Sequence, residues 1–268
     1  MAGLSACAEL VSRGVRVVLI EQRRDLGGRA SSCRHRGSGQ ILDLGPHTVI
    51  ESNRHFLQYL TRVNTRHLME FSPTLHIPFV HLNKGVATFH CPGWRAPWGF
   101  LWGVMRYRLL GLHDRWAAVQ MGRYLSSRDD DHLAEISIEE WLCQRKVSYD
   151  ARVAFWDPLI YSVLNDHPSR LSLRSLGRIF RIGFLARDQR SGLGVPQVDW
   201  SRLVTGDLPE QIANSGGEII TGRRVHLLWI DGGRVKGVIF GDNHRLEADA
   251  VIAAVPISPA TVMSILRT

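Results

Sequence analysis

The feature that most constrains the fold is the order of elements expected over residues 2–21. Residues 2–13 have the Ala, Leu and Ser content of a short helix, and Gly14 stands where glycine commonly ends one. A β-branched apolar run follows over residues 15–20, which is typical of a buried parallel strand, and it closes on Glu21. Helix, tight turn, strand and terminal acid form the second half of a βαβ nucleotide-binding unit, where such an acid accepts hydrogen bonds from ribose hydroxyls. We therefore predict that Glu21 binds ribose; a solvated glutamate at a strand end is the alternative.

The first half of that unit is not present in the sequence. The dinucleotide fingerprint G-x-G-x-x-G follows a strand and opens the helix, and here only its last glycine has a counterpart, Gly3. In such a unit the glycines let the backbone approach the pyrophosphate at the helix N-terminus, where free N–H groups and the helix dipole hold anions. We expect Gly3 to contact the cofactor and the chain to be truncated at its N-terminus.

Residues 2–32, AGLSACAELVSRGVRVVLIEQRRDLGGRASS, resemble the N-terminus of the flavin amine oxidase and phytoene desaturase superfamily. The resemblance implies an FAD cofactor and a Gly-Gly-Arg loop along the flavin diphosphate. It assigns cofactor binding to Gly27, Gly28, Arg29 and Ser32. The assignment is physically reasonable, because glycine permits close backbone approach and arginine offers phosphate a forked donor. An ordinary Gly-Gly turn with a surface arginine is the alternative.

A second element of the superfamily, D-x-G-x-H, lies near the flavin ring and matches Asp43, Gly45 and His47. The resemblance implies that Gly45 gives the substrate room beside the cofactor. His47 is the candidate catalytic residue, because histidine titrates near neutral pH and can donate a proton or a hydrogen bond. A structural histidine in a turn is the alternative.

The C-terminal part returns to the character of a nucleotide-binding domain. Residues 215–256 predict strand, polar turn at 231–233, strand, loop and strand. The resemblance implies that the backbone of Val225 lies against the adenine, and that residues 248–256 form a strand that brings Ala253, Ala254 and Pro256 near the dinucleotide. The Gly-Asp element that covers the flavin in the superfamily is absent before Thr268. We therefore expect the chain to be incomplete at both ends.

The middle of the chain predicts a mainly helical domain. Residues 75–92 predict a β-hairpin that turns at Lys84 and Gly85, and Ser137 with Glu140 forms the pattern of a capping box. The W-L element at 141–142 and F-W-x-P-L at 155–159 resemble the squalene-associated FAD-dependent desaturases, also known as hydroxysqualene dehydroxylases. The DLGPH sequence at 43–47 departs from the D-N-G-x-H of that subgroup.

Residues 94–112 combine Trp, Leu and Gly with interspersed arginines. Such a segment suits a membrane interface or the entrance for an apolar substrate; helical core packing is the alternative. No run of about twenty apolar residues occurs. The four cysteines lack metal spacing and indicate a reducing compartment, so we expect a cytoplasmic protein, peripheral at the inner face of the membrane. The net charge of +8 suits an anionic surface, and no nucleic-acid motif accompanies it.

Together these features predict an α/β fold: a Rossmann-like FAD-binding domain without its first strand, and an inserted mainly helical or α+β substrate domain. The expected boundaries are 1–72 for the first part of the FAD-binding domain, 73–212 for the substrate domain and 213–268 for the second part. The expected function is FAD-dependent oxidation or reduction of an isoprenoid lipid, either hydroxysqualene reduction to squalene or a related desaturation. The alternatives are a phytoene or carotenoid desaturase, an amine oxidase, a nicotinamide-dependent Rossmann protein, and a catalytically inert fragment.

Overall fold

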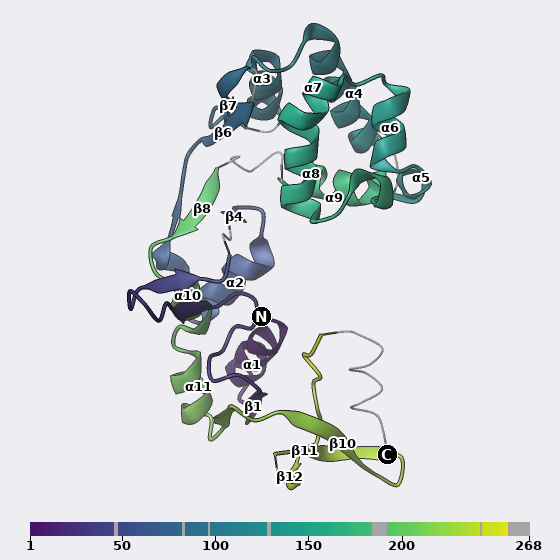
Figure 1. Cartoon of the computed structure of the whole chain (residues 1–268). Coiled ribbons are helices and arrows are strands. Elements are labelled where there is room, and N and C mark those ends of the chain that lie inside the picture. The colour runs from purple at the N-terminus through teal and green to yellow at the C-terminus, as the bar shows by residue number, and fades with distance from the viewer. Residues whose placement is uncertain are drawn as a thin grey trace. The chain divides into compact units, whose positions relative to one another are not determined.

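A computed structural model describes residues 1–45, 48–81, 84–95, 97–127, 130–183, 192–241 and 243–256 (Figure 1). The chain divides into two compact units. Unit 1 comprises residues 1–47, 54–70 and 195–268, and unit 2 comprises residues 48–53 and 71–194. Each unit is described by itself.

Unit 1 is a mixed α/β body. Its helices are α1 (Ala2–Ser12), α2 (Arg54–Arg62), the 3-10 turn η1 (Arg66–Leu68), α10 (Trp200–Thr205) and α11 (Leu208–Asn214). Its strands are β1 (Val18–Glu21), β2 (Ser32–Arg34), β3 (Ile41–Asp43), β9 (Glu218–Thr221), β10 (Val225–Asp231), β11 (Arg234–Phe240) and β12 (His244–Glu247).

The opening of unit 1 follows the predicted order of elements. Helix α1 ends as expected: Gly14 takes a φ of 76° and donates its N–H to the Val11 carbonyl at 2.9 Å, which caps the helix. Strand β1 then pairs in parallel with β9, with Glu21 opposite Thr221. The prediction of a parallel strand is confirmed, but the prediction of a buried one is wrong. Val18 is exposed and the rest of β1 is only half-buried, since β9 is the one strand that pairs with it among the described residues.

The remaining strands of unit 1 form antiparallel pairs. β2 pairs with β3, and β10, β11 and β12 form a meander. The β10–β11 turn falls at the predicted place, with Gly232 and Gly233 at φ values of 55° and 73°, as a tight hairpin turn of the primed type requires. The strand expected over residues 248–256 is not found: residues 251–256 form no strand and residues 252–256 are exposed.

Unit 2 joins a hairpin to a helical body. Its helices are α3 (Trp98–Arg106), α4 (Leu112–Ser127), α5 (Asp130–Ala134), α6 (Ile138–Gln144), α7 (Tyr149–Ala151), the π-helical turn η2 (Arg152–Trp156), α8 (Asp157–Leu164), the 3-10 turn η3 (Pro168–Arg170) and α9 (Leu173–Gly183). The strands of the hairpin are β6 (Leu75–His81) and β7 (Gly85–Cys91). Three short strands form a further small sheet of order β4-β8-β5: β4 (Val49–Ile50), β8 (Leu193–Pro196) and β5 (Met69–Phe71).

An aromatic cluster fills the core of unit 2. The rings of Phe89 and Tyr107 meet edge to face at 5.6 Å, and Phe100 meets Phe180 in the same way at 5.4 Å. The hairpin turn and the capping box form as predicted: Gly85 has a φ of 70°, and the Ser137 hydroxyl accepts the Glu140 N–H at 3.1 Å. The buried hydrophobic residues of the hairpin and of the helices belong to one cluster, so unit 2 has one continuous core. The turn and the capping box predicted from the sequence are consistent with it.

The boundaries of the compact units differ from the predicted domains: residues 48–53 and 71–72, expected in the FAD-binding domain, belong to unit 2. Residues 195–212, expected in the substrate domain, belong to unit 1. The Tyr59 hydroxyl of α2 donates to the Val204 carbonyl of α10, and the Thr65 hydroxyl donates to the Leu203 carbonyl at 2.7 Å. These buried bonds attach α10 to α2 and to the turn that follows it. Breaking them would leave a carbonyl unpaired in the interior of unit 1, which is costly.

Candidate functional site

The predicted cofactor residues begin at the first turn of α1. Gly3 faces residue 254: a Cβ placed on Gly3 would lie 3.3 Å from the Ala254 Cβ and 3.9 Å from Leu19 Cδ1. The Met1 amine lies 3.5 Å from the Gly27 carbonyl oxygen. Burial lowers the pKa of this amine, while the negative charge of Glu21 raises it and the positive charge of Arg29 lowers it. The structure therefore brings Gly3, Glu21, Gly27, Arg29 and Ala254 to one end of α1.

Glu21 lies at the carboxyl end of β1, where ligands of parallel α/β sheets bind. Its carbonyl accepts the Arg223 N–H at 3.1 Å, and one carboxylate oxygen accepts the Arg23 N–H at 3.0 Å. For the other oxygen the described residues provide no hydrogen-bond donor. A half-buried carboxylate with an acceptor atom to spare has the chemistry that a ribose hydroxyl requires.

The Gly-Gly-Arg loop has two different glycines. Gly27 is buried with a φ of 105°, and a Cβ there would overlap the Ala30 carbonyl oxygen, so its role is to let the loop fold. Gly28 has a φ of 65° and no atom within 4 Å of its Cβ position, so a ligand could approach its backbone. Arg29 follows on the surface.

The hydroxyl of Ser32 has two hydrogen-bond partners within the protein. The Ser32 side chain is buried, donates to an Asp43 carboxylate oxygen at 2.6 Å and accepts the Ser201 N–H at 3.1 Å. The same Asp43 oxygen accepts the Trp200 N–H at 3.0 Å. The Ser32 hydroxyl thus connects the β2–β3 hairpin to the start of α10, and its predicted contact with FAD stays a prediction.

The remaining predicted residues are Gly45, Val225, Pro256 and His47. Gly45 follows β3 with a φ of 126° and open space at its Cβ position. Val225 opens β10, two residues after the Arg223 that bonds to Glu21. Pro256 is exposed at the end of the described C-terminal segment, and His47 lies outside the described residues.

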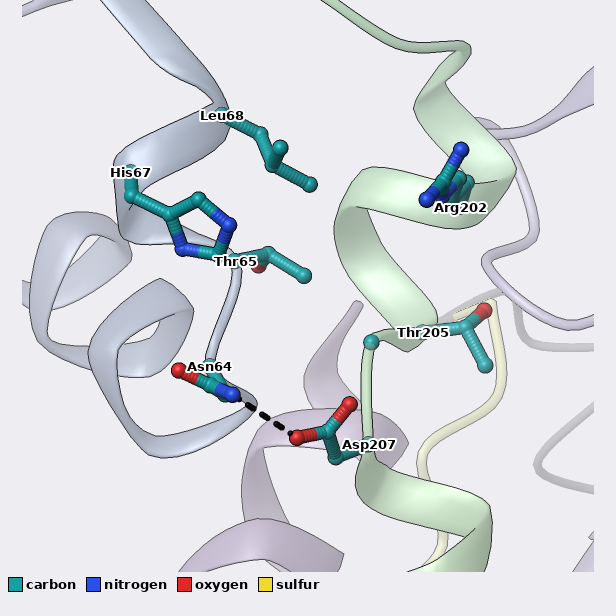
Figure 2. Close-up of a pocket in the computed structure, with 8 residues that line it drawn as sticks. Asn64, Thr65, His67, Leu68, Arg202, Thr205 and Asp207 are labelled. Carbon is teal, nitrogen blue, oxygen red and sulfur yellow. Dashed lines mark hydrogen bonds between the residues drawn. The ribbon is translucent and has the colours of Figure 1, made fainter.

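A pocket of about 410 Å³ lies elsewhere in unit 1, between the end of α2 and the α10–α11 turn (Figure 2). Asn64 donates to Asp207 across it at 3.0 Å, and His67 and Arg202 also line it. None of the predicted residues lines this pocket. We therefore keep the candidate site at the start of α1. No sequence motif marks the pocket, because its lining residues come from segments about 140 positions apart in the chain.

The residues at the start of α1 fit a dinucleotide. The first turn of α1 carries no side-chain cap and no acidic residue, so its N–H groups and dipole favour an anion. Arg29 adds a cation, Glu21 an acceptor for a hydroxyl, and Gly28 an open backbone position. A diphosphate joined to ribose requires this combination of donors and acceptors. Within the described segments no cluster of metal-ligating side chains occurs.

The comparisons with known proteins identify a flavin-dependent family. The family model for flavin containing amine oxidoreductases matches residues 1–266. An oxidoreductase from Methanosarcina mazei superposes with a TM-score of 0.66 at 18% identity, over 93% of this chain and 55% of the other. A putrescine oxidase triple mutant gives 0.59 at 18% identity, over 98% and 58%. A reduced UDP-galactopyranose mutase gives 0.54 at 16% identity, over 94% and 53%. No curated protein matches the chain.

These matches confirm the α/β fold class and the flavin cofactor at the level of the family. The chain spans a little over half the length of these solved structures. The squalene-associated subgroup is finer than the family model distinguishes. The chain belongs to the family of flavin containing amine oxidoreductases.

Proposed function

We propose that the chain carries part of an FAD-dependent oxidoreductase that acts on an isoprenoid lipid, with reduction of hydroxysqualene to squalene as the reaction. The observation that carries the FAD assignment is the group at the start of α1: Glu21 with an acceptor to spare, Arg29, and the open backbone at Gly28. The lipid assignment is supported by the resemblance of residues 141–142 and 155–159 to squalene-associated desaturases.

Each residue of the group has a defined task in this proposal. Glu21 accepts a hydrogen bond from a ribose hydroxyl, and the first N–H groups of α1 with Arg29 hold the diphosphate. Gly28 lets the backbone approach the cofactor. Val225 supports the adenine, and Gly3, Ala254 and Pro256 line the dinucleotide. When bound, the flavin exchanges hydride with the substrate carbon. His47 is proposed to donate a proton or a hydrogen bond near the ring.

An amine oxidase is the second candidate, and two observations favour it: the family model and the similarity to a putrescine oxidase. The two candidates differ in what they require of the substrate. An amine oxidase removes hydride from a carbon beside nitrogen, whereas a dehydroxylase delivers hydride as a hydroxyl leaves, so one reduces the flavin and the other oxidises it.

The direction of electron flow tests the proposal. We would incubate the chain with FAD, remove unbound cofactor and record the visible spectrum without oxygen. Bleaching by putrescine would overturn the isoprenoid assignment in favour of an amine oxidase, and bleaching by phytoene would favour a desaturase. Re-oxidation of the chemically reduced protein by hydroxysqualene, with squalene as the product, is the expected result. If the chain holds flavin and reacts with none of the three, it is an inert member of the family.

A further inference from the structure

Helix α3 of unit 2 presents a row of large apolar side chains to solvent. Trp98, Trp102 and Met105 follow one another at i, i+4 and i+7, so they share one face of the helix. Their exposed fractions are 64%, 43% and 46%. Trp94, just before the helix, is 51% exposed, and its ring lies 5.3 Å from that of Trp102. We call these four residues the tryptophan face.

The opposite side of α3 fixes the direction of the tryptophan face. A Cβ on Gly99 would come within 2.7 Å of the Pro92 carbonyl oxygen, and one on Gly103 within 2.8 Å of the His90 carbonyl oxygen. These glycines let α3 lie against the end of the β6–β7 hairpin (Figure 1). Phe100 and Val104, on the same inner side, are buried in the aromatic core. The helix cannot rotate its tryptophans inward without giving up this close packing.

The charges around the tryptophan face are positive. Arg95, Arg106 and Arg108 are exposed on the same stretch of chain, and the Arg106 guanidinium carbon lies 5.5 Å from the centre of the Trp102 ring. Between residues 84 and 123 the sequence holds six Lys or Arg residues and a single acid, Asp114. Asp114 is buried and accepts hydrogen bonds from Ser148, so it does not offset the arginines at the surface.

Indole rings beside exposed arginines match the interface of an anionic bilayer. Tryptophan settles at headgroup level, with its ring in the apolar boundary and its N–H in the polar layer, and arginine pairs with lipid phosphate. A second copy of the chain fits less well, because a twofold contact through this face would set Arg95 and Arg106 against the same arginines of the other copy. No described helix has the length and apolarity that a crossing of the membrane needs.

We propose that the tryptophan face and its arginines dock the protein on the surface of an anionic lipid bilayer. The docking is peripheral: α3 is nine residues long and lies along the surface with its outer side in the headgroup layer. This inference does not depend on flavin or on the identity of the substrate. It would give an enzyme for isoprenoid lipids access to the phase in which such substrates dissolve.

Vesicle sedimentation tests the proposal. The purified chain is mixed with vesicles of phosphatidylcholine alone or with roughly 30% phosphatidylglycerol, and the bound fraction is measured against lipid and salt concentration. We expect binding to the anionic vesicles that weakens with salt. Trp98→Ser with Trp102→Ser should lower the partition coefficient by at least about tenfold. Arg95→Gln should lower it by about fivefold, because one basic charge is removed.

The matched control is Ile182→Ser, which removes an exposed apolar side chain from α9 of the same unit. It should bind vesicles like the unaltered chain. All variants change exposed residues, and a thermal melt verifies that each is folded. Equal binding by the double tryptophan variant, or no binding by the unaltered chain, would refute the proposal. Light scattering without lipid tests whether a second copy of the chain covers the tryptophan face instead. If the unaltered chain is a dimer and the double tryptophan variant is a monomer, this face is a contact between copies and the proposal is refuted.

Discussion

Replacing Ser32 by alanine separates the two roles that this residue could have. The resemblance assigns Ser32 to the flavin site, whereas the structure gives its hydroxyl two protein partners, Asp43 and Ser201. If the hydroxyl holds the β2–β3 hairpin to α10, then Ser32→Ala should lower the stability of unit 1 and leave the affinity for FAD unchanged.

The magnitude follows from the two hydrogen bonds. The bond to the Asp43 carboxylate is 2.6 Å long and charge-assisted, and such bonds contribute about 1.5–3 kcal/mol. The Ser201 N–H, only partly buried, would lose its acceptor at a cost of about 1 kcal/mol. The expected loss is therefore about 2.5–4 kcal/mol, which would lower the melting temperature by roughly 8–16 °C for a unit of this size.

The assay is a thermal melt followed by circular dichroism, with FAD titrated well below the melting temperature. The matched control is Ser38→Ala in the same hairpin: its hydroxyl is exposed and bonds locally to His35, so the change should be about 0.5 kcal/mol or less. A Ser32→Ala variant that melts like the unaltered chain but binds FAD more weakly would refute this reasoning. It would support the assignment of Ser32 to the flavin site.

Two further predictions concern the interiors of the units. Gly206 has a φ of 46°, and a Cβ there would overlap the Val63 carbonyl oxygen. Gly206→Ala should therefore lower the free energy of unfolding, measured in urea, by more than about 3 kcal/mol. The control Gly222→Ala, also at positive φ but with open space around the Cβ position, should lower it by only about 1 kcal/mol. Burial raises the pKa of Tyr107 to about 12 from about 10 in the unfolded chain. Because the pKa of Tyr107 is higher in the folded protein, the neutral, buried hydroxyl contributes its full stability below about pH 10. That contribution is lost as the pH rises from about 10 to about 12. Tyr107→Phe should therefore flatten that part of a stability–pH curve; an unchanged slope would contradict the assignment.

The sequence predicted those elements whose signals are local. Gly14 ends α1, Gly85 turns the β6–β7 hairpin and Ser137 caps α6, because each depends on backbone conformation or a contact within a few residues. The parallel placement of β1 also followed from a local order, since a strand that leaves a helix through a tight turn packs beside a parallel neighbour.

The errors arise where the outcome depends on distant partners. Residues 248–256 are apolar enough for a strand, yet a strand needs a neighbour for its N–H and C=O groups, and none pairs with residues 251–256 in the described part of the chain. Helix α10 falls in unit 1 because its attachment is made by the distant residues Tyr59 and Thr65. The hydrogen bond between Ser201 and the Ser32 hydroxyl could not be predicted from the sequence either, since Ser201 lies 169 positions away.

The measurement that tests the central claim most directly is an equilibrium titration of FAD with three proteins: the unaltered chain, Glu21→Gln and Asp25→Asn. Asp25 is an exposed acid in the same loop, so its change alters the net charge equally. We expect the unaltered chain and Asp25→Asn to bind FAD alike. Glu21→Gln should bind about tenfold more weakly, because the charged acceptor for ribose is lost. Equal affinities for all three proteins would contradict a dinucleotide site at the end of β1.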